Sequence, residues 1–192
     1  PSHQWSNIFF LIILLTTLAT AVSKAFLVDV PIEDWLNFTS SRFSLFNKVY
    51  CDNYNNISQA KLKQASTIVL SPGPGNPKNY PITSKIYKNF KGKKKIIGIC
   101  LGFQQILFCE GAKIVEQKKI YHGFQSSIKV INNKSLFKKG KKFNVGRYHS
   151  LKLKEPFKIK DFEITMRCLN SNVAMAFENN KDKIYGFQFH PE

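Results

Sequence analysis

Acidic residues are scarce in this chain of 192 residues. Asp and Glu together number 12 against 29 Lys and Arg, which gives a formal net charge of +17 at pH 7. Arginine is also scarce, occurring only at Arg42, Arg147 and Arg167, so the positive charge is almost wholly lysine. The lysines are scattered along the sequence, and no nucleic-acid-binding motif accompanies them. We therefore expect a solvated basic surface, no nucleic-acid partner, and a field that favours anionic partners.

Cysteine is infrequent, with four residues at Cys51, Cys100, Cys109 and Cys168. None of them forms a C-x-x-C pair, and their spacing suggests neither a disulfide framework nor a zinc site. This usage favours a reducing compartment, and we expect a cytoplasmic location and no bound metal.

Apolar runs long enough to span a bilayer are also lacking. The main apolar run, residues 8–22, has 15 residues, whereas about 20 are needed. It resembles a signal-peptide core, but no positively charged segment precedes it. A buried element and a non-native extension are the other interpretations. We treat residues 1–24 as an apolar N-terminal extension of open status. We expect no membrane association and a single domain over residues 25–192, truncated at its C-terminus.

The apolar pattern predicts strands that alternate with helices in the first half of the chain and follow one another in the second half. Strands are expected over residues 25–30, 48–51, 67–70, 95–99, 112–115, 126–131, 144–153, 162–169, 173–178 and 184–190, and helices over residues 81–90 and 101–110. Alternation favours parallel pairing, and consecutive strands favour antiparallel pairing. The sequence therefore predicts an α/β fold with a mixed, mainly parallel central sheet flanked by helices.

The most informative stretch is the junction of a predicted strand and a predicted helix at Cys100. Gly98 and Gly102 flank this cysteine in the pattern G-x-C-x-G. The pattern is the cysteine form of the nucleophile elbow, a sharp turn in which side chains at the flanking positions would be crowded. The start of the helix favours a thiolate at Cys100. A buried structural cysteine is the alternative, because most free cysteines are of that kind.

A thiol nucleophile needs a base and a group that orients the base. His190 ends a predicted strand, and Glu192 follows two residues later, so both side chains leave the same face of an extended backbone. The carboxylate can then bond one ring nitrogen while the other faces Cys100, as in a serine triad. His122 and His149 are competing bases, but neither has a carboxylate at this spacing.

Three motifs together resemble the class I (triad) glutamine amidotransferases. They are GICLGFQ at residues 98–104, SPGPGNP at residues 71–77 and HPE at residues 190–192. The SPGPG form, with YHG at residues 121–123 and RYHSL at residues 147–151, resembles the chorismate branch of that family. This branch contains the small subunits of anthranilate synthase and of aminodeoxychorismate synthase. Residues 33–39 depart from the branch pattern, since only Phe38 and Thr39 match it.

The resemblance implies a role for each site residue and a flavodoxin-like fold. The implied catalytic triad is Cys100, His190 and Glu192. The implied oxyanion hole consists of the N–H groups of Gly73 and Leu101. The residues implied to bind glutamine are Gly75, Gln104, Ser150 and Leu151. Neither a metal nor a cofactor is implied for this subunit.

The resemblance also implies a glutaminase that hydrolyses L-glutamine and supplies ammonia to a chorismate-binding synthase large subunit. The first interpretation is the small subunit of anthranilate synthase, in tryptophan biosynthesis. The corresponding subunit of aminodeoxychorismate synthase, in folate biosynthesis, is the runner-up. Two alternatives lie outside these assemblies: a thiol hydrolase without a synthase, and a non-catalytic, membrane-tethered homologue.

Overall fold

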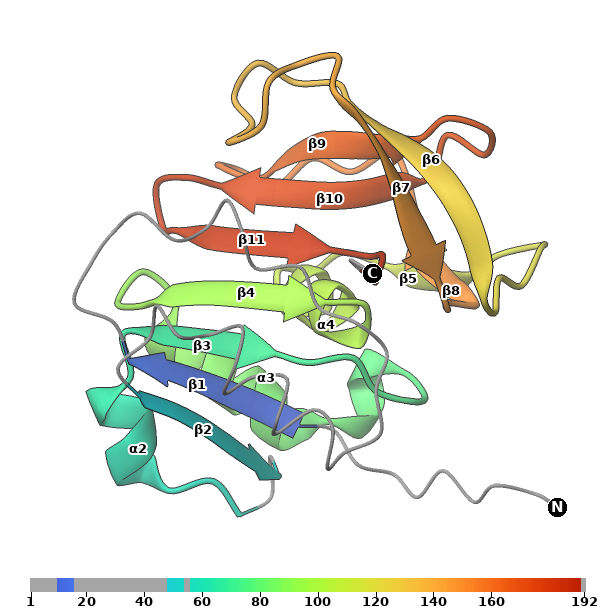
Figure 1. The fold of residues 1–192 in the computed structure, drawn as a ribbon. Coiled ribbons are helices and arrows are strands. Elements are labelled where there is room, and N and C mark those ends of the chain that lie inside the picture. The colour runs from blue at the N-terminus through green and yellow to red at the C-terminus, as the bar shows by residue number, and fades with distance from the viewer. Residues whose placement is uncertain (1–9, 16–47, 54–55, 191–192) are drawn as a thin grey trace, which may run out of the picture.

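The computed structural model describes residues 10–15, 48–53 and 56–190, which Figure 1 draws as the coloured ribbon. The strand predicted over residues 25–30, the divergent segment 33–39 and Glu192 lie outside the described residues.

A mixed sheet of nine strands runs through the described part of the chain in the order β2-β1-β3-β4-β11-β10-β9-β6-β7. Its strands are β1 Phe10–Leu15, β2 Lys48–Asn53, β3 Thr67–Leu70, β4 Lys95–Ile99, β6 Phe124–Val130, β7 Lys142–Arg147, β9 Glu163–Cys168, β10 Ala174–Asn179 and β11 Ile184–Phe187. A second, two-stranded sheet pairs β5 Ile114–Glu116 with β8 Leu151–Leu153. Parallel pairing joins β3 to β4 and β4 to β11, and the other described pairs are antiparallel. The predicted mixed α/β sheet is therefore confirmed, with fewer parallel pairs than expected.

Helices flank the half of the sheet that contains β1, β3, β4 and β11. They are α2 Gln59–Gln64, the 3₁₀ turn η2 Pro77–Asn79, α3 Pro81–Phe90 and α4 Leu101–Cys109. Helices α3 and α4 pack together, and α4 contacts β3, β4 and β11 (Figure 1). Pro81 occupies the first position of α3, where its fixed φ suits a helix and its missing N–H costs nothing. The two helices predicted from the sequence are thus present.

The strand predicted over residues 144–153 is wrong in one respect: it is two strands, β7 and β8, that belong to different sheets. The chain leaves the main sheet after Arg147, and a hydrogen bond between Nδ1 of His149 and the carbonyl of Leu151 (2.8 Å) closes a turn between the strands. Residues 148–150 contain neither Gly nor Pro, so the sequence lacked the usual signal of a turn there.

Strand β1 lies inside the apolar run of residues 8–22. It pairs antiparallel with β2 on one side and with β3 on the other. Part of the run is therefore an element of the main sheet. The domain boundary at residue 24 stays a prediction. Within the described ranges, no helix is both long enough and apolar enough to cross a membrane.

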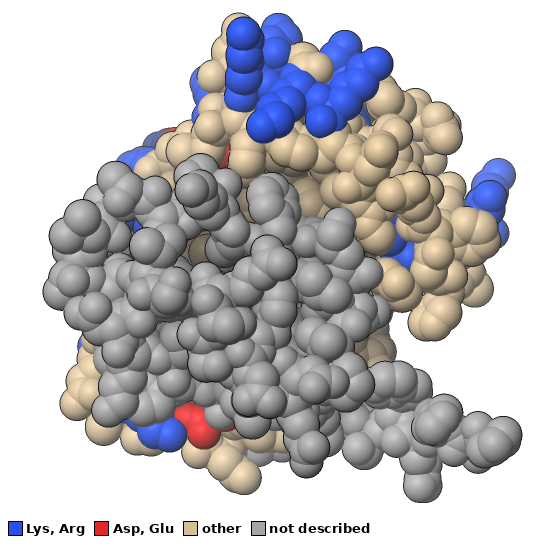
Figure 2. Space-filling view, viewed as in Figure 1, with Lys and Arg blue, Asp and Glu red and all other residues tan. Residues whose placement is uncertain are grey.

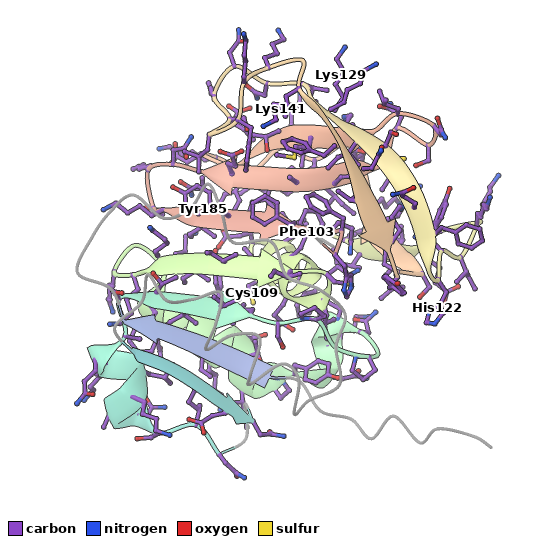
Figure 3. The ribbon with its side chains drawn as sticks, viewed as in Figure 1. Phe103, Cys109, His122, Lys129, Lys141 and Tyr185 are labelled. Atoms are coloured by element: carbon purple, nitrogen blue, oxygen red, sulfur yellow. The ribbon has the colours of Figure 1, made fainter. Side chains whose placement is uncertain are left out.

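The core beneath the sheet fixes the position of α4. Phe103 of α4 is fully buried, and its ring centroid lies 5.2 Å from that of Phe177 on β10 (Figure 3). The ring centroid of Phe162 also lies 5.4 Å from that of Phe177. Burying an aromatic side chain of this size contributes about 1.5–3 kcal/mol. These rings therefore hold the start of α4 firmly against the centre of the sheet.

Basic side chains gather at one end of the face that Figure 2 shows. Figure 2 shows Lys and Arg gathered where β6 and β7 are joined, at the top of the molecule in Figure 1. Figure 3 labels Lys129 and Lys141 at this end of the hairpin. The exposed lysines there are Lys129, Lys134, Lys138, Lys139, Lys141 and Lys142.

Candidate active site

A cavity of about 140 Å³ opens beside Cys100. It is lined by Gly73, Pro74, Gly75, Cys100, Leu101, Gln104, Tyr148, His149, Ser150 and Leu151. These residues come from three segments: the loop after β3, the β4–α4 junction and the turn between β7 and β8. The structure therefore brings together the predicted nucleophile, both predicted oxyanion residues and all four predicted glutamine-binding residues.

Cys100 lies in a strained turn between β4 and α4. Its backbone angles are φ 51° and ψ −101°, in a region that non-glycine residues rarely adopt. Two hydrogen bonds hold this conformation: the Cys100 N–H donates to the carbonyl of Phe187 (2.7 Å), and the Cys100 carbonyl accepts from the N–H of Gln104 (3.2 Å). The side chain is only 6% exposed, at the wall of the cavity. This is the strand–turn–helix context of a nucleophile elbow.

The two glycines beside Cys100 allow α4 to approach the sheet closely. A Cβ at Gly98 would lie 2.5 Å from the carbonyl carbon and oxygen of Gly102. A Cβ at Gly102 would lie 2.0 Å from the carbonyl oxygen of Leu70, at the end of β3. Both distances are far below van der Waals contact. The G-x-C-x-G pattern therefore reflects helix–sheet packing as well as the turn itself.

The loop after β3 is held rigidly against the cavity. The Tyr80 hydroxyl donates to the carbonyl of Pro74 (2.7 Å), and the side chain of Asn76 accepts from the N–H of Lys78 (3.1 Å). Gly75 has φ +80°, a conformation that favours glycine. Gly73 lies in the same loop and lines the cavity. A fixed loop of this kind can hold a backbone N–H at a constant place.

Leu101 is the first residue of α4, and it lines the same cavity as the loop after β3. The N–H groups of the first helical turn have no acceptor within the helix, and they carry its partial positive charge. The predicted oxyanion donors Gly73 and Leu101 therefore lie on one cavity beside Cys100. Their role as donors stays a prediction.

Gln188 is a buried site residue that the sequence analysis missed. Its side-chain oxygen accepts from Nε2 of Gln104 (3.0 Å), and its own Nε2 lies 3.8 Å from Sγ of Cys100. Gln188 precedes His190 by two residues, so the alternation that pairs His190 with Glu192 places Gln188 on the same face. That spacing was the available signal. Tyr148, another lining residue not predicted, lies inside the RYHSL motif at residues 147–151.

Strand pairing carries His190 toward the nucleophile. Strand β11 runs parallel to β4, with Phe187 opposite Ile99, so the residues after Phe187 leave the sheet beside Cys100. His190 exchanges two backbone hydrogen bonds with Gly146 (3.0 and 3.2 Å). Its ring centroid lies 5.0 Å from that of Tyr148, which lines the cavity. His190 itself is not a lining residue. With Glu192 outside the described residues, the triad stays a prediction.

The competing histidines occupy other positions. His149 is 4% exposed, and burial lowers its pKa to about 4, so its ring is neutral at pH 7. Its two ring nitrogens contact Arg147 and the carbonyl of Leu151. His122 is exposed, and its ring lies 5.6 Å from that of Tyr148 (Figure 3). Both ring nitrogens of His149 are therefore engaged by groups other than Cys100. In the described segments, no group of three His, Cys, Asp or Glu side chains could hold a metal ion.

Two solved structures share this fold. A glutamine amidotransferase of Thermotoga maritima superposes with a TM-score of 0.58 at 18% identity, over 71% of this chain and 60% of that chain. A glutamine amidotransferase of Methylobacillus flagellatus gives a TM-score of 0.55 at 15% identity, over 71% and 55% of the two chains. The fold is therefore that of glutamine amidotransferases.

Comparison of the sequence with protein families identifies the family within this class. Residues 41–192 match the family described as glutamine amidotransferase class-I, and the chain belongs to that family. The family resemblance inferred from the three motifs is thereby confirmed, as is the enzyme class at the level of the family.

Curated relatives carry related names. An anthranilate synthase component 2 of Lactococcus lactis is 38% identical over 131 residues, 68% of this chain and 66% of that protein. An anthranilate synthase component 2 of Helicobacter pylori is 35% identical over 184 residues, 88% of each. The bifunctional protein TrpGD of Thermotoga maritima is 37% identical over 146 residues, 76% of this chain and 24% of that protein. The matched segment therefore covers less than two thirds of the Lactococcus lactis protein and of the Thermotoga maritima protein.

Proposed function

We propose that this chain is the glutaminase subunit of anthranilate synthase, which hydrolyses L-glutamine and supplies ammonia to a chorismate-aminating partner. One observation carries the proposal. The cavity beside the strained Cys100 is lined by the residues that the motifs assign to the oxyanion and to glutamine, and they come from three separate segments of the chain.

In the proposed reaction, the Cys100 thiolate adds to the side-chain carbonyl carbon of glutamine. The N–H groups of Gly73 and Leu101 stabilise the negative oxygen of the tetrahedral intermediate. His190 gives a proton to the leaving nitrogen, and ammonia departs as the glutamyl thioester forms. His190 then takes a proton from water, whose attack on the thioester releases glutamate and the thiol. Glu192 orients the His190 ring and stabilises its charged form.

Gln104 is proposed to bind the substrate through its amide oxygen. Its amide nitrogen donates to Gln188 (3.0 Å) and, at 3.4 Å, to the carbonyl of Leu151. These bonds fix the orientation of the amide group, so its oxygen is the atom that can accept from the substrate. The backbone of Gly75, Ser150 and Leu151 completes the proposed binding site.

Anthranilate synthase is chosen because the relatives described above carry that name. The implied partner is a chorismate-binding large subunit, and the proposed location is the cytoplasm. The runner-up is the glutaminase subunit of aminodeoxychorismate synthase, whose synthase partner also uses chorismate. The two differ in product, so the assay below also separates them.

The test is the substitution Cys100→Ser, assayed with the large subunit. Glutamine-driven product formation should be lost, because a serine hydroxyl is a poor nucleophile in a site built for a thiolate. Formation of product from chorismate and free ammonium at high pH should continue, because the partner alone uses the ammonia. Anthranilate and aminodeoxychorismate are measured separately on the same preparation.

The matched control is Cys109→Ser, at the far end of α4 (Figure 3), which should leave both activities unchanged. If Cys100→Ser keeps its glutamine-driven activity, the nucleophile lies elsewhere. If it also loses the ammonium-driven activity, Cys100 has a structural role.

A further inference from the structure

Arg147, the last residue of β7, is a completely buried cation with neutral partners. Its exposed fraction is 0%, and its guanidinium carbon lies 3.5 Å from the ring centroid of Tyr121. Its N–H groups donate to Nε2 of His149 (3.1 Å), Oε1 of Gln117 (3.4 Å), Oγ of Ser171 (3.4 Å) and Sγ of Cys168 (3.6 Å). Among the described residues, no carboxylate forms an ion pair with it. Burying a charge in this way is costly, so the hydrogen bonds that the guanidinium makes must offset the loss of its hydration.

The guanidinium determines where the proton lies on His149. Arginine is always protonated and can only donate, so Nε2 of His149 must be the acceptor in the 3.1 Å contact. The proton of the neutral ring is then on Nδ1. Nδ1 lies 2.8 Å from the carbonyl oxygen of Leu151 and donates to it. The amide nitrogen of Gln117, 2.9 Å from Nδ1, donates instead to the His149 carbonyl at 2.6 Å.

The Leu151 carbonyl joins this chain of hydrogen bonds to the cavity. Ser150 and Leu151 line the cavity, and the same carbonyl also accepts from Nε2 of Gln104 at 3.4 Å. A continuous path therefore runs from Arg147 through His149 to the cavity wall, and on through Gln104 and Gln188 toward Cys100.

The surroundings of His149 keep its ring neutral. The charged and titratable groups that face it are Arg147 on β7, His190 after β11 and the Tyr121 ring, which stacks on it at 6.3 Å. Burial, and to a lesser extent Arg147 and His190, lower its pKa to about 4. The arrangement therefore persists throughout the neutral range.

We propose that Arg147 and His149 are positioning residues of the glutamine site, an inference that rests on the proposed glutaminase function. The guanidinium fixes the tautomer of His149, and Nδ1–H of His149 fixes the Leu151 carbonyl at the cavity wall. Neither side chain acts as acid, base or nucleophile. Their effect is on the geometry of the turn that binds the substrate.

The kinetic test compares His149→Leu with His149→Asn in the complex with the large subunit. His149→Leu removes the donor and should raise KM for glutamine roughly tenfold, the size of one lost hydrogen bond, with a smaller change in kcat. His149→Asn places an amide N–H near the position of Nδ1 and should recover most of that loss. Arg147→Met should resemble His149→Leu.

The matched control is Arg167→Met. Arg167 lies on β9, bonds Glu155 and the carbonyl of Asn172, and is absent from the cavity wall. This variant tests the loss of an arginine without touching the His149 turn, so KM for glutamine should stay at the wild-type value. A folded His149→Leu with wild-type KM, or a KM rise in Arg167→Met equal to that in Arg147→Met, overturns the proposal.

A second measurement does not depend on activity. The ¹⁵N chemical shifts of the imidazole rings report the tautomer, and the signal of His149 is assigned by its loss in His149→Asn; the chain has four histidines. Wild type should show His149 as the neutral Nδ1–H tautomer, and Arg147→Met should shift it toward Nε2–H. A wild-type Nε2–H tautomer overturns the proposal that Arg147 fixes the tautomer of His149. A wild-type complex that releases no glutamate overturns the glutaminase proposal instead.

Discussion

Gly73 and Leu101 are the two residues whose N–H groups would face a developing oxyanion. Both line one cavity, Gly73 in a loop fixed by Tyr80 and Leu101 at the first position of α4. Each contributes through its backbone. The electrostatic part of the proposed catalysis therefore depends on where the backbone lies, and a side chain that alters this position should lower turnover.

The substitution Gly73→Val tests whether the backbone N–H of Gly73 stabilises the oxyanion. The added side chain should displace or cover the N–H, and the loss of one oxyanion donor typically costs on the order of 10²-fold or more in kcat. Glutamate release is measured alongside thermal unfolding. The control is Lys78→Ala in the same loop, where the side chain is exposed and outside the cavity wall. Normal turnover in a folded Gly73→Val protein would remove Gly73 from the oxyanion hole.

At the residue scale, motifs predicted the groups whose chemistry or backbone freedom is distinctive. Cys100, Gly73 and Gly75 belong to this kind, and the structure gathers them at one cavity. Arg147 and Gln188 were not predicted as site residues, and several of their contacts are made across the fold. Arg147 meets Gln117 and Ser171, and Gln188 meets Gln104, which is distant in sequence. No local pattern encodes such pairs.

At the scale of elements, the contact between α4 and β3 determines where the nucleophile lies. Gly102 sits directly against the Leu70 carbonyl, with no space for a methyl group. Alanine ordinarily stabilises a helix by up to about 1 kcal/mol relative to glycine. Here, the steric clash should outweigh that gain.

Gly102→Ala should therefore destabilise the protein and displace Cys100, because α4 must move away from β3. The expected loss is about 1–3 kcal/mol in the free energy of unfolding, together with a large fall in turnover. The comparison is Gly111→Ala, just beyond α4, where a Cβ would have no neighbour within 4 Å but φ is +86°. The free energy of unfolding of Gly111→Ala should fall by about 1 kcal/mol from backbone strain alone, and its turnover should not change. Denaturant unfolding and glutamate release decide the matter, and a fully active Gly102→Ala would contradict this account of the elbow.

Elements with strong periodicity or clear end signals were predictable, and short polar ones were not. Helix α3 begins at Pro81 as the sequence predicted. Helix α2 was missed because it has six residues and buries only Leu62, so its apolar pattern is too short to detect. The break between β7 and β8 was missed because side-chain bonds of His149, rather than Gly or Pro, turn the chain there.

At the scale of the molecule, the position of β11 could not be derived from the sequence pattern. This strand comes last in the described chain yet lies between β4 and β10 in the middle of the sheet (Figure 1). Its parallel pairing with β4 joins segments about ninety residues apart, and local periodicity carries no information on such pairing. The consequence is functional, since this insertion brings His190 to the same edge of the sheet as Cys100.

The concentration of lysine at the β6–β7 end of the molecule comes mainly from one stretch of sequence, because Lys138, Lys139, Lys141 and Lys142 surround Gly140. The central claim does not depend on this surface. It is that the sheet, the elbow and the loop after β3 together make Cys100 the nucleophile of a glutamine site.

Covalent labelling with a diazoketone analogue of glutamine, followed by peptide mass spectrometry, tests that claim most directly. The other cysteines of the chain, including Cys109 and Cys168, serve as internal controls in the same sample. The account predicts one adduct per chain, on Cys100, that excess glutamine prevents and that Cys100→Ser abolishes. An adduct on Cys109 or Cys168 in its place, or a folded protein whose Cys100 stays unmodified at saturating reagent, would contradict it.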